Sequence, residues 1–432
     1  MMKKILFALA FAATVMSACS KPVEKPSWFT NASYFEEKNG MYEEMPVFES
    51  NIVMVGDDYI DRGLWNEFYG DTCIKNRGIT YDATEHVLYR IDKIAKGKPF
   101  KIVVSVGWND IMHGTPADEI VANIEKIFKR IHKLSPKTKG YWMNIVNSGK
   151  LTAEQQALVD EVNEKVAARA GKAGFEVVDI NAPLREGVDN GTYSWDGGKY
   201  LNGAGYAVLA ETLAPYLSRT ALNKPADKED ALEVSDYYKH RVSLFRSMPA
   251  DSGKIIMLGN SLNNNALWTE LFPMGYIINR GISGDVVEGV DQRLDEVTRH
   301  KPHKIYLITA TNDFINDSDV TALEVWKRYE KLIQDIISQM PKTSLYVQST
   351  LPLNPKSKFY PGFNERAAEL NKLLSGAAER YGYFYLDIAS LLSDENGDLR
   401  DEYTFDGIHL NATGYFVWAA ELAKGGRMLR II

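Results

Sequence analysis

Cysteine is almost absent from this sequence of 432 residues, which contains only Cys19 and Cys73. Two thiols are too few for the disulfide framework that stabilises small secreted domains. No group of cysteines and histidines has the spacing of a structural zinc site. A disulfide-rich or zinc-stapled fold is therefore excluded, and we expect neither a metal nor an organic cofactor.

A strong charge of one sign is also absent. Lysine and arginine number 50 and aspartate and glutamate number 57, which gives a net charge of −7, and both signs are interspersed. No basic run or stripe could follow a phosphate backbone, so we expect no nucleic-acid partner. Beyond the N-terminus, no apolar run approaches the length of a membrane-spanning helix.

The N-terminus has the features of a secretion signal. Residues 1–18 contain two lysines followed by the apolar stretch ILFALAFAATVMSA, which is too short and too early for a typical membrane-spanning helix. Residues 16–19, Met-Ser-Ala-Cys, are similar to a bacterial lipoprotein signal, in which Cys19 becomes the acylated first residue. We expect an exported lipoprotein anchored to a membrane of a bacterial envelope, with residues 19–30 as a tether. An ordinary secretory signal with an incidental cysteine is the alternative.

The sequence repeats itself. A shift of 203 positions superimposes one stretch on another without a gap, from Tyr34 on Tyr237 to Asp110 on Asp313. The matched residues include Gly56 and Gly259, Trp65 and Trp268, Arg90 and Arg293, and the segments 76–79 and 279–282, both Asn-Arg-Gly-Ile. A register of this length indicates a tandem duplication. We expect one domain at residues 31–218, a polar linker at 219–231 and a second domain at 232–432.

Each half alternates short apolar runs with amphipathic patterns. The runs are NIVMVG, FKIVVSVG, GYWMNIV and FEVVDI in the first half and KIIMLG, KIYLIT, SLYVQST and YFYLDI in the second. Residues 117–134 and 153–173 lie between such runs and have the periodicity of helices. Strands that alternate with helices predict an α/β class fold, a parallel sheet covered by helices on both faces, in each half.

Four blocks of the second half contain residues suited to nucleophilic chemistry. KIIMLGNSLN at 254–263 predicts a buried strand that ends in a sharp turn, which would place Ser261 at the carboxyl end of the sheet. NRGISGD at 279–285, TND at 311–313 and DGIH at 406–409 follow. A serine in such a turn more often caps a helix, but a nucleophilic serine needs a histidine base, which in turn needs an orienting partner. The four blocks together predict a serine hydrolase.

These blocks, in this order across residues 254–423, resemble the SGNH/GDSL hydrolase family, in particular its platelet-activating-factor acetylhydrolase-like and carbohydrate-esterase branches. The resemblance implies a flavodoxin-like α/β/α fold and a catalytic triad of Ser261, Asp406 and His409. It also implies an oxyanion hole formed by Ser261, Gly284 and Asn312. Two positions depart from the family pattern, Asn260 in place of aspartate and Ala310 in place of glycine. Neither position touches a reacting group.

The first half has lost these residues. Asp58 replaces the serine and Tyr81 replaces Gly284, where we expect its side chain to crowd the approach that an oxyanion needs. The last block becomes residues 196–202, with Lys199 or Tyr200 in place of the histidine. We expect this half to be inactive and to serve as a structural partner that buries one face of the second half. A glycan-binding module is the alternative, and a nucleophilic or metal-binding Asp58 is disfavoured.

The substrate is suggested by a loop of the second half at residues 352–363. It contains Phe359, Tyr360 and Phe363, which the first half lacks. These aromatic residues could stack on sugar rings or could simply anchor the loop. We expect an esterase that hydrolyses short acyl esters, acetyl in particular, on a glycan. A lipid esterase, lysophospholipase or thioesterase is the alternative enzyme, and a non-catalytic glycan-binding surface lipoprotein is the alternative class.

Overall fold

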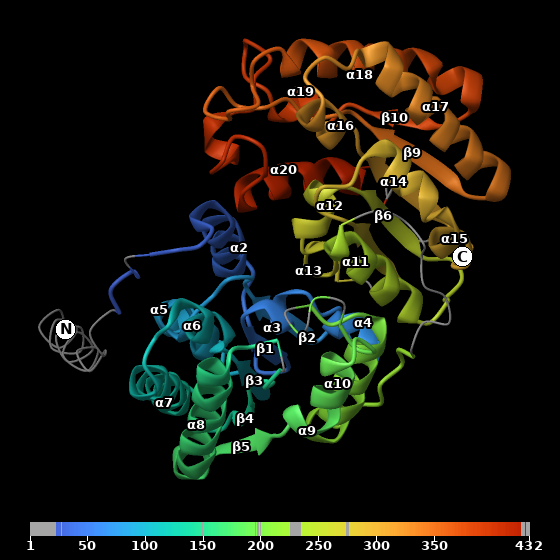
Figure 1. The fold of residues 1–432 in the computed structure, drawn as a ribbon. Helices are drawn as coiled ribbons and strands as arrows, with labels where there is room; N and C mark the ends of the chain where they lie inside the picture. Colours follow the sequence, from blue (N-terminus) through green and yellow to red (C-terminus); the bar gives the residue numbers. More distant parts are fainter. Residues whose placement is uncertain are drawn as a thin grey trace, which may run out of the picture.

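The chain folds into two α/β units, one from each half of the sequence (Figure 1). The structure is a computed structural model that describes residues 23–26, 28–148, 150–194, 196, 198, 200–224, 235–273, 276–424 and 428. The predicted signal sequence, Cys19 and residues 20–22 and 27 of the predicted tether lie outside these residues. Within them, no helix is both long enough and apolar enough to cross a membrane.

The first half is built on a parallel five-stranded sheet with the order β2-β1-β3-β4-β5. Its strands are β1 (Ile52–Gly56), β2 (Ile74–Gly78), β3 (Lys101–Ser105), β4 (Lys139–Met143) and β5 (Phe175–Val178). Its helices are α2 (Ala32–Glu44), α3 (Asp58–Asp61), α4 (Trp65–Tyr69), α5 (Thr84–Lys96), α6 (Trp108–His113), α7 (Ala117–Leu134), α8 (Ala153–Ala170), α9 (Asn181–Asp189) and α10 (Gly203–Leu217), with a 3₁₀ turn, η1, at Gly171–Ala173.

The second half repeats this arrangement, with the strand order β10-β9-β8-β6-β7. Its strands are β6 (Ile255–Gly259), β7 (Ile277–Gly281), β8 (Lys304–Ile308), β9 (Ser344–Gln348) and β10 (Phe384–Leu386). Its helices are α11 (Asp236–Ser247), α12 (Ser261–Asn265), α13 (Trp268–Leu271), α14 (Val287–Gln292), α15 (Leu294–Thr298), α16 (Thr311–Asn316), α17 (Ala322–Gln339), α18 (Phe363–Tyr381), α19 (Ala389–Leu392) and α20 (Ala412–Ala423), with a 3₁₀ turn, η2, at Asp401–Tyr403. The prediction of two tandem three-layer α/β/α domains is confirmed.

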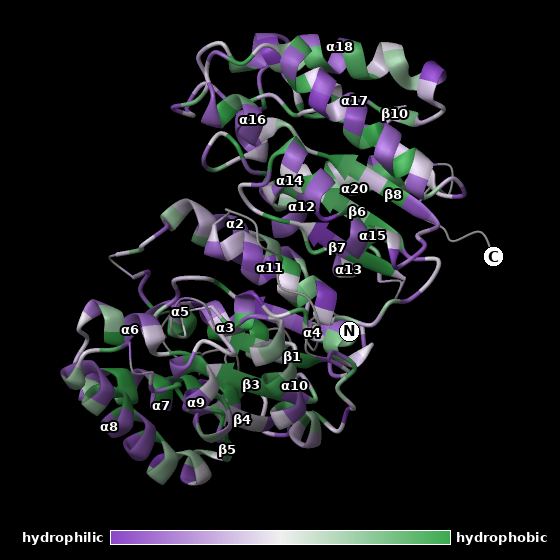
Figure 2. Cartoon of the chain, turned by 45° about the vertical axis from the view of Figure 1, so that its right-hand side comes forward, coloured by the Kyte–Doolittle hydropathy of each residue, from purple (hydrophilic) through white to green (hydrophobic). Residues whose placement is uncertain are grey.

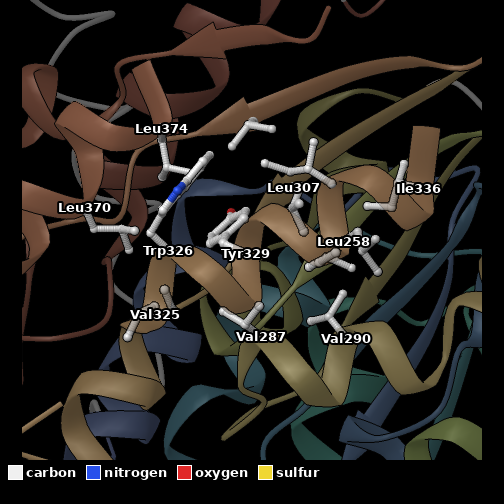
Figure 3. Close-up of a cluster of buried hydrophobic side chains, with 14 of the residues drawn as sticks. Leu258, Val287, Val290, Leu307, Val325, Trp326, Tyr329, Ile336, Leu370 and Leu374 are labelled. Atoms are coloured by element: carbon white, nitrogen blue, oxygen red, sulfur yellow. The ribbon is translucent and has the colours of Figure 1, made fainter. Parts of the chain in front are cut away.

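The central strands are buried on both faces, which explains why they are continuous apolar runs in the sequence. Figure 3 shows one face of the second core, where Tyr329 of α17 packs near Leu258 and Leu307 of the sheet. The sheets are mostly hydrophobic, whereas outer helices such as α8 carry hydrophilic residues on their exposed side (Figure 2). Burial of these apolar faces therefore fixes both sheets, and with them the loops at their carboxyl ends.

Two buried ion pairs join the halves, and they are reciprocal. Arg77 of β2 donates to both carboxylate oxygens of Glu270, at 2.7 and 2.9 Å. Arg280 of β7 donates to both carboxylate oxygens of Glu67, at 3.2 and 3.0 Å. Both the arginines and the glutamates are 203 positions apart in the sequence. Each half thus contributes an equivalent arginine and an equivalent glutamate to the contact, as in a two-fold symmetric dimer, but within one chain.

The equivalent helices α2 and α11 lie between the halves (Figure 1). On α2, Tyr34 donates to Asp61 of the first half at 2.7 Å, while Glu37 accepts a hydrogen bond from Asn265 of the second half at 3.0 Å. On α11, Arg241 donates to the backbone oxygen of Arg62 in the first half at 2.9 Å. These helices therefore bring residues of each half to the carboxyl end of the other half's sheet.

Candidate active site

Ser261 lies at the carboxyl end of β6, where the strand order of the sheet reverses. A Cβ at Gly259 would collide with the carbonyl oxygen of Ile308, so only glycine allows this strand to approach β8. The Asn260 side chain accepts a hydrogen bond from the N–H of Leu262 at 3.1 Å and caps α12. Ser261 is the first residue of that helix, as the glycine-asparagine turn predicts.

The structure brings Ser261, His409 and Asp406 together. His409 Nε2 lies 3.0 Å from Ser261 Oγ, and His409 Nδ1 lies 2.7 Å from Asp406 Oδ2. The other oxygen of Asp406 accepts the backbone N–H groups of Ile408 and His409, both at 2.8 Å. Because Asp406 accepts a hydrogen bond from the Nδ1–H group, the neutral histidine carries its lone pair on Nε2, facing the serine hydroxyl.

The pKa values of this pair fit a base and its orienting carboxylate. Burial raises the pKa of Asp406, but the hydrogen bond and charge of His409 outweigh burial and lower it to about 2. Burial lowers the pKa of His409, but the hydrogen bond to Asp406 and the carboxylates of Glu37 and Asp406 outweigh burial and hold it above its ordinary value. At neutral pH, Asp406 is therefore ionised and His409 is a stronger base than free imidazole.

Gly284 and Asn312 lie beside the serine and histidine. All four line a cavity of about 530 Å³ between the two halves. Gly284 has φ +83°, in the left-handed region that favours glycine, and Asn312 Nδ2 donates to the backbone oxygen of Asp285 at 2.9 Å. The loop and the asparagine are therefore fixed before any substrate arrives, as an oxyanion site requires.

The first half keeps the counterparts of these donors, but they are occupied. Asp58 Oδ2 accepts the N–H of Tyr81 at 3.0 Å and Asn109 Nδ2 at 2.9 Å, the equivalents of Gly284 and Asn312. Tyr81 has φ +72° and so keeps the backbone conformation of the glycine. Our expectation that Tyr81 blocks the approach to this N–H is therefore wrong, because a carboxylate oxygen of Asp58 already reaches it.

The position of the histidine in the first half is also filled differently. The Arg62 guanidinium lies 3.9 Å from the ring centroid of Tyr200, and Arg62 Nη2 lies 3.9 Å from Asp58 Oδ1. Lys199 lies outside the described residues. Asp58 is thus held by donors and a cation, without a hydroxyl to acylate, which is in keeping with the predicted inactivity of this half.

The three aromatic residues of the long loop do not line the cavity that contains Ser261. Phe363 is fully buried, and its ring centroid lies 5.7 Å from that of Phe314 in an edge-to-face contact. Phe359 and Tyr360 pack against the same core, and Tyr360 donates to Asp398 at 3.0 Å. Of the two interpretations, the structure favours the loop anchor, because burial of these apolar faces is favourable, and sugar stacking by these rings inside the cavity of Ser261 is not supported.

Sequence reasoning missed Glu37, which the first half contributes to the site of the second. Glu37 is 3 % exposed and accepts a hydrogen bond from Asn265, at the end of the helix that Ser261 begins. Burial raises its pKa to about 7, against the lowering effect of the His409 charge. No motif marks this residue, because Asn265 is 228 positions away in the sequence.

Replacing Glu37 by glutamine is expected to move the acidic limb of the pH profile of kcat/KM to lower pH. The Glu37 carboxylate favours protonated His409, so its removal lowers the pKa of the base, while glutamine keeps an oxygen for Asn265. The measurement is short-chain ester hydrolysis across pH, with Glu36→Gln on the outer side of α2 as the matched control. An unmoved limb, or one at higher pH, would contradict this coupling.

A serine, a histidine and an aspartate linked in this way at the carboxyl end of a parallel sheet define the arrangement of an α/β serine hydrolase. The chain belongs to the GDSL-like Lipase/Acylhydrolase family, whose sequence profile matches residues 55–208 and 258–416, more than half of the chain. Each half gives one match, in agreement with the tandem duplication. The protein is accordingly a carboxylic ester hydrolase.

Several known proteins are similar to part of this chain. Platelet-activating factor acetylhydrolase IB subunit alpha2 of Rattus norvegicus is 26 % identical over 200 residues, which is 43 % of this chain and 83 % of the relative. A GDSL-like lipase of Bacteroides thetaiotaomicron is 18 % identical, with a TM-score of 0.39, and the match covers 44 % of this chain and 97 % of that one. A carbohydrate acetylesterase family member of Sinorhizobium meliloti is 16 % identical, with a TM-score of 0.34, over 41 % and 98 % of the two chains.

Proposed function

We propose that the second half hydrolyses short acyl esters, acetyl esters in particular, on a glycan. The observation that carries this proposal is the 3.0 Å approach of His409 Nε2 to Ser261 Oγ, with Asp406 on the opposite nitrogen of the same ring. A serine hydroxyl is a weak nucleophile until a base accepts its proton, and this geometry supplies that base.

The reaction has two steps. Ser261 Oγ attacks the ester carbonyl carbon while His409 takes the hydroxyl proton, and His409 then gives that proton to the departing alcohol. The N–H groups of Ser261 and Gly284 and the amide of Asn312 hold the negative oxygen of the tetrahedral intermediate. Water, deprotonated by His409, then attacks the acyl group on Ser261, releases the carboxylic acid and restores the hydroxyl.

The lining of the cavity supports a small acyl group on a hydroxyl-rich alcohol. Tyr34, Tyr237, Asn264 and Asn265 line the same cavity as Ser261, and a long acyl chain packed against them would displace water from their polar groups without replacing its hydrogen bonds. The rat relative is by its name an acetylhydrolase, which is in keeping with acetyl as the acyl group.

The test is acetate release from acetylated polysaccharides by the purified protein, beside a series of 4-nitrophenyl esters of increasing chain length. We expect acetate release and the highest kcat/KM for the acetyl ester. A preference for long acyl chains would favour a lipid esterase. Failure to hydrolyse any ester would contradict the proposal and favour a glycan-binding protein.

We also propose that Cys19 carries the lipid that anchors the protein to the membrane. Replacing Cys19 by alanine is expected to move the protein from the membrane fraction to the soluble fraction, because the chain contains no other apolar stretch of comparable length. The measurement is fractionation of cells that express either form. A variant that still pellets with membranes in high salt would show that another feature holds it there.

A further inference from the structure

The cavity that contains Ser261 has a second, cationic wall. Its members are Arg62 of the first half and Arg241 of α11, which line the same cavity as Ser261 and His409. The side chain of Arg62 is 10 % exposed, and Arg241 is 6 % exposed. Two guanidinium groups are thus almost completely withdrawn from water at the edge of a polar cavity.

Aromatic rings connect this wall to the serine. The Arg62 guanidinium lies 3.9 Å from the ring centroid of Tyr200 and 4.8 Å from that of Tyr237. The Tyr237 hydroxyl donates to Asn264 Oδ1 at 3.2 Å, and Asn264 lies one helical turn after Ser261. Residues three apart share a helix face, so the cations and the nucleophile face a common space.

The carboxylates that line the cavity are already paired with other cations. Asp61 lies 3.3 Å from Lys38, Glu67 accepts from Arg280, and Glu270 accepts from Arg77. These pairs leave little negative charge for the cationic wall.

Arg62 has only a long ion pair with Asp58, and Arg241 has no carboxylate partner among the described residues. The carboxylate near Arg62 belongs to Asp58, at 3.9 Å, and its other oxygen is bound by Tyr81 and Asn109. Arg241 forms no ion pair with a described carboxylate, and its Nη1 donates only to a backbone oxygen. The Nε–H groups of both arginines are buried without an acceptor in the described part of the chain.

Burial of these two guanidinium groups destabilises the protein unless an anion binds to them. Burial of a charged group without a counterion or hydrogen bonds destabilises a protein, and guanidinium groups match carboxylate, sulfate and phosphate oxygens in fixed geometry. Burial and the charges of Arg62 and Arg241 together lower the pKa of the adjacent His240 well below its ordinary value, so this histidine is neutral and supplies no further charge.

We propose that the cationic wall binds an acidic group on the alcohol part of the ester, a carboxylate, sulfate or phosphate, so that the half without the catalytic serine helps to select the substrate. This inference rests on the proposed esterase function. It makes the substrate an acetylated acidic glycan rather than a neutral one, with the acetyl ester at Ser261 and the anion at Arg62 and Arg241.

The experiment compares 4-acetoxybenzoate with 4-acetoxybenzamide, which differ in the negative charge and carry the same acetyl ester. At low salt, we expect wild-type kcat/KM to be about tenfold higher for the benzoate, the size of effect that one charge-assisted hydrogen bond supplies. Added salt should reduce this preference. The double variant Arg62→Gln, Arg241→Gln should lose the preference, and the loss should lie in KM for the benzoate rather than in kcat.

Matched variants separate charge from packing. Arg62→Lys with Arg241→Lys keeps the charge and should retain part of the preference, whereas Lys239→Gln on the outer side of α11 should retain all of it. Wild-type enzyme that hydrolyses both esters equally would overturn this inference and leave the esterase proposal intact. Wild-type enzyme that hydrolyses neither ester would overturn the proposed function itself. If the glutamine variant does not fold, the wild-type ratio of kcat/KM for the two esters and its dependence on salt still test the inference.

Discussion

Replacing Ser261 by alanine is expected to lower kcat for a short-chain ester by about 10⁴- to 10⁶-fold, the range seen when the nucleophile of a serine triad is removed. The substitution removes one hydroxyl oxygen that faces a cavity and no core volume. Without that oxygen no acyl-enzyme can form, although the oxyanion donors and His409 remain. The thermal midpoint should stay close to that of the wild type.

The measurements are initial rates and thermal unfolding of both proteins. Ser338→Ala, on the exposed side of α17, is the matched control and should keep wild-type turnover. A Ser261→Ala enzyme that turns over at a rate comparable to the wild type would show that the reaction uses another nucleophile.

Replacing Glu270 by alanine is expected to lower the free energy of unfolding by about 3–5 kcal/mol, the cost of removing one partner of a buried ion pair. Arg77 is fully buried and donates hydrogen bonds to both carboxylate oxygens of Glu270, at 2.7 and 2.9 Å. The variant leaves this guanidinium without its carboxylate, and it also removes the partner of the Lys75 ammonium, which lies 3.5 Å from Glu270 Oε2.

Urea unfolding tests this prediction, with Glu43→Ala as the control. Glu43 pairs with Lys93 at the surface, where such pairs contribute about 0–1 kcal/mol. Glu67→Ala should cost less than Glu270→Ala, because Arg280 keeps a second buried carboxylate, Glu296, at 3.0 Å. An unchanged urea midpoint for Glu270→Ala would mean that this contact does not stabilise the packing of the two halves.

The contribution of the Arg77–Glu270 ion pair to the free energy of unfolding is expected to decrease in acid. Burial raises the pKa of Glu270, but the charge and hydrogen bonds of Arg77 outweigh burial and lower it below its ordinary value. Its contribution to stability is therefore present above the pKa of an unfolded glutamate and is lost as the pH falls through the lower, folded value. The difference between wild type and Glu270→Ala should shrink only in acid.

Much of the fold and the core of the site could be predicted from the sequence. Continuous apolar runs marked the buried strands, because a parallel sheet is covered on both faces. The helix predicted at 117–134 has those bounds in the structure, and the one predicted at 153–173 ends in a 3₁₀ turn after Ala170. The serine, aspartate and histidine could be found because they lie in local blocks with recognisable turns.

What could not be predicted depends on contacts between distant segments. Glu37 accepts a hydrogen bond from Asn265, which is 228 positions away in the sequence. Arg241 donates to the backbone oxygen of Arg62, which is 179 positions away. No periodicity or spacing encodes such contacts, because they arise from how the two halves pack. The role of the aromatic residues in the loop at 352–363 could not be predicted for a related reason. Composition does not reveal which side chains are exposed, and the ring of Phe363 is fully buried in the core.

The reciprocal ion pairs have a consequence for how this protein could diversify. In a dimer of identical chains, every substitution at the interface occurs twice, so a residue useful on one side must also be tolerated on the other. Here the two sides are encoded separately, and position 62 is arginine while its counterpart 265 is asparagine. An arginine at both positions would set a second guanidinium in the place where Asn265 donates to Glu37. Fusion into one chain removes that constraint, so one copy can specialise in chemistry and the other in recognition.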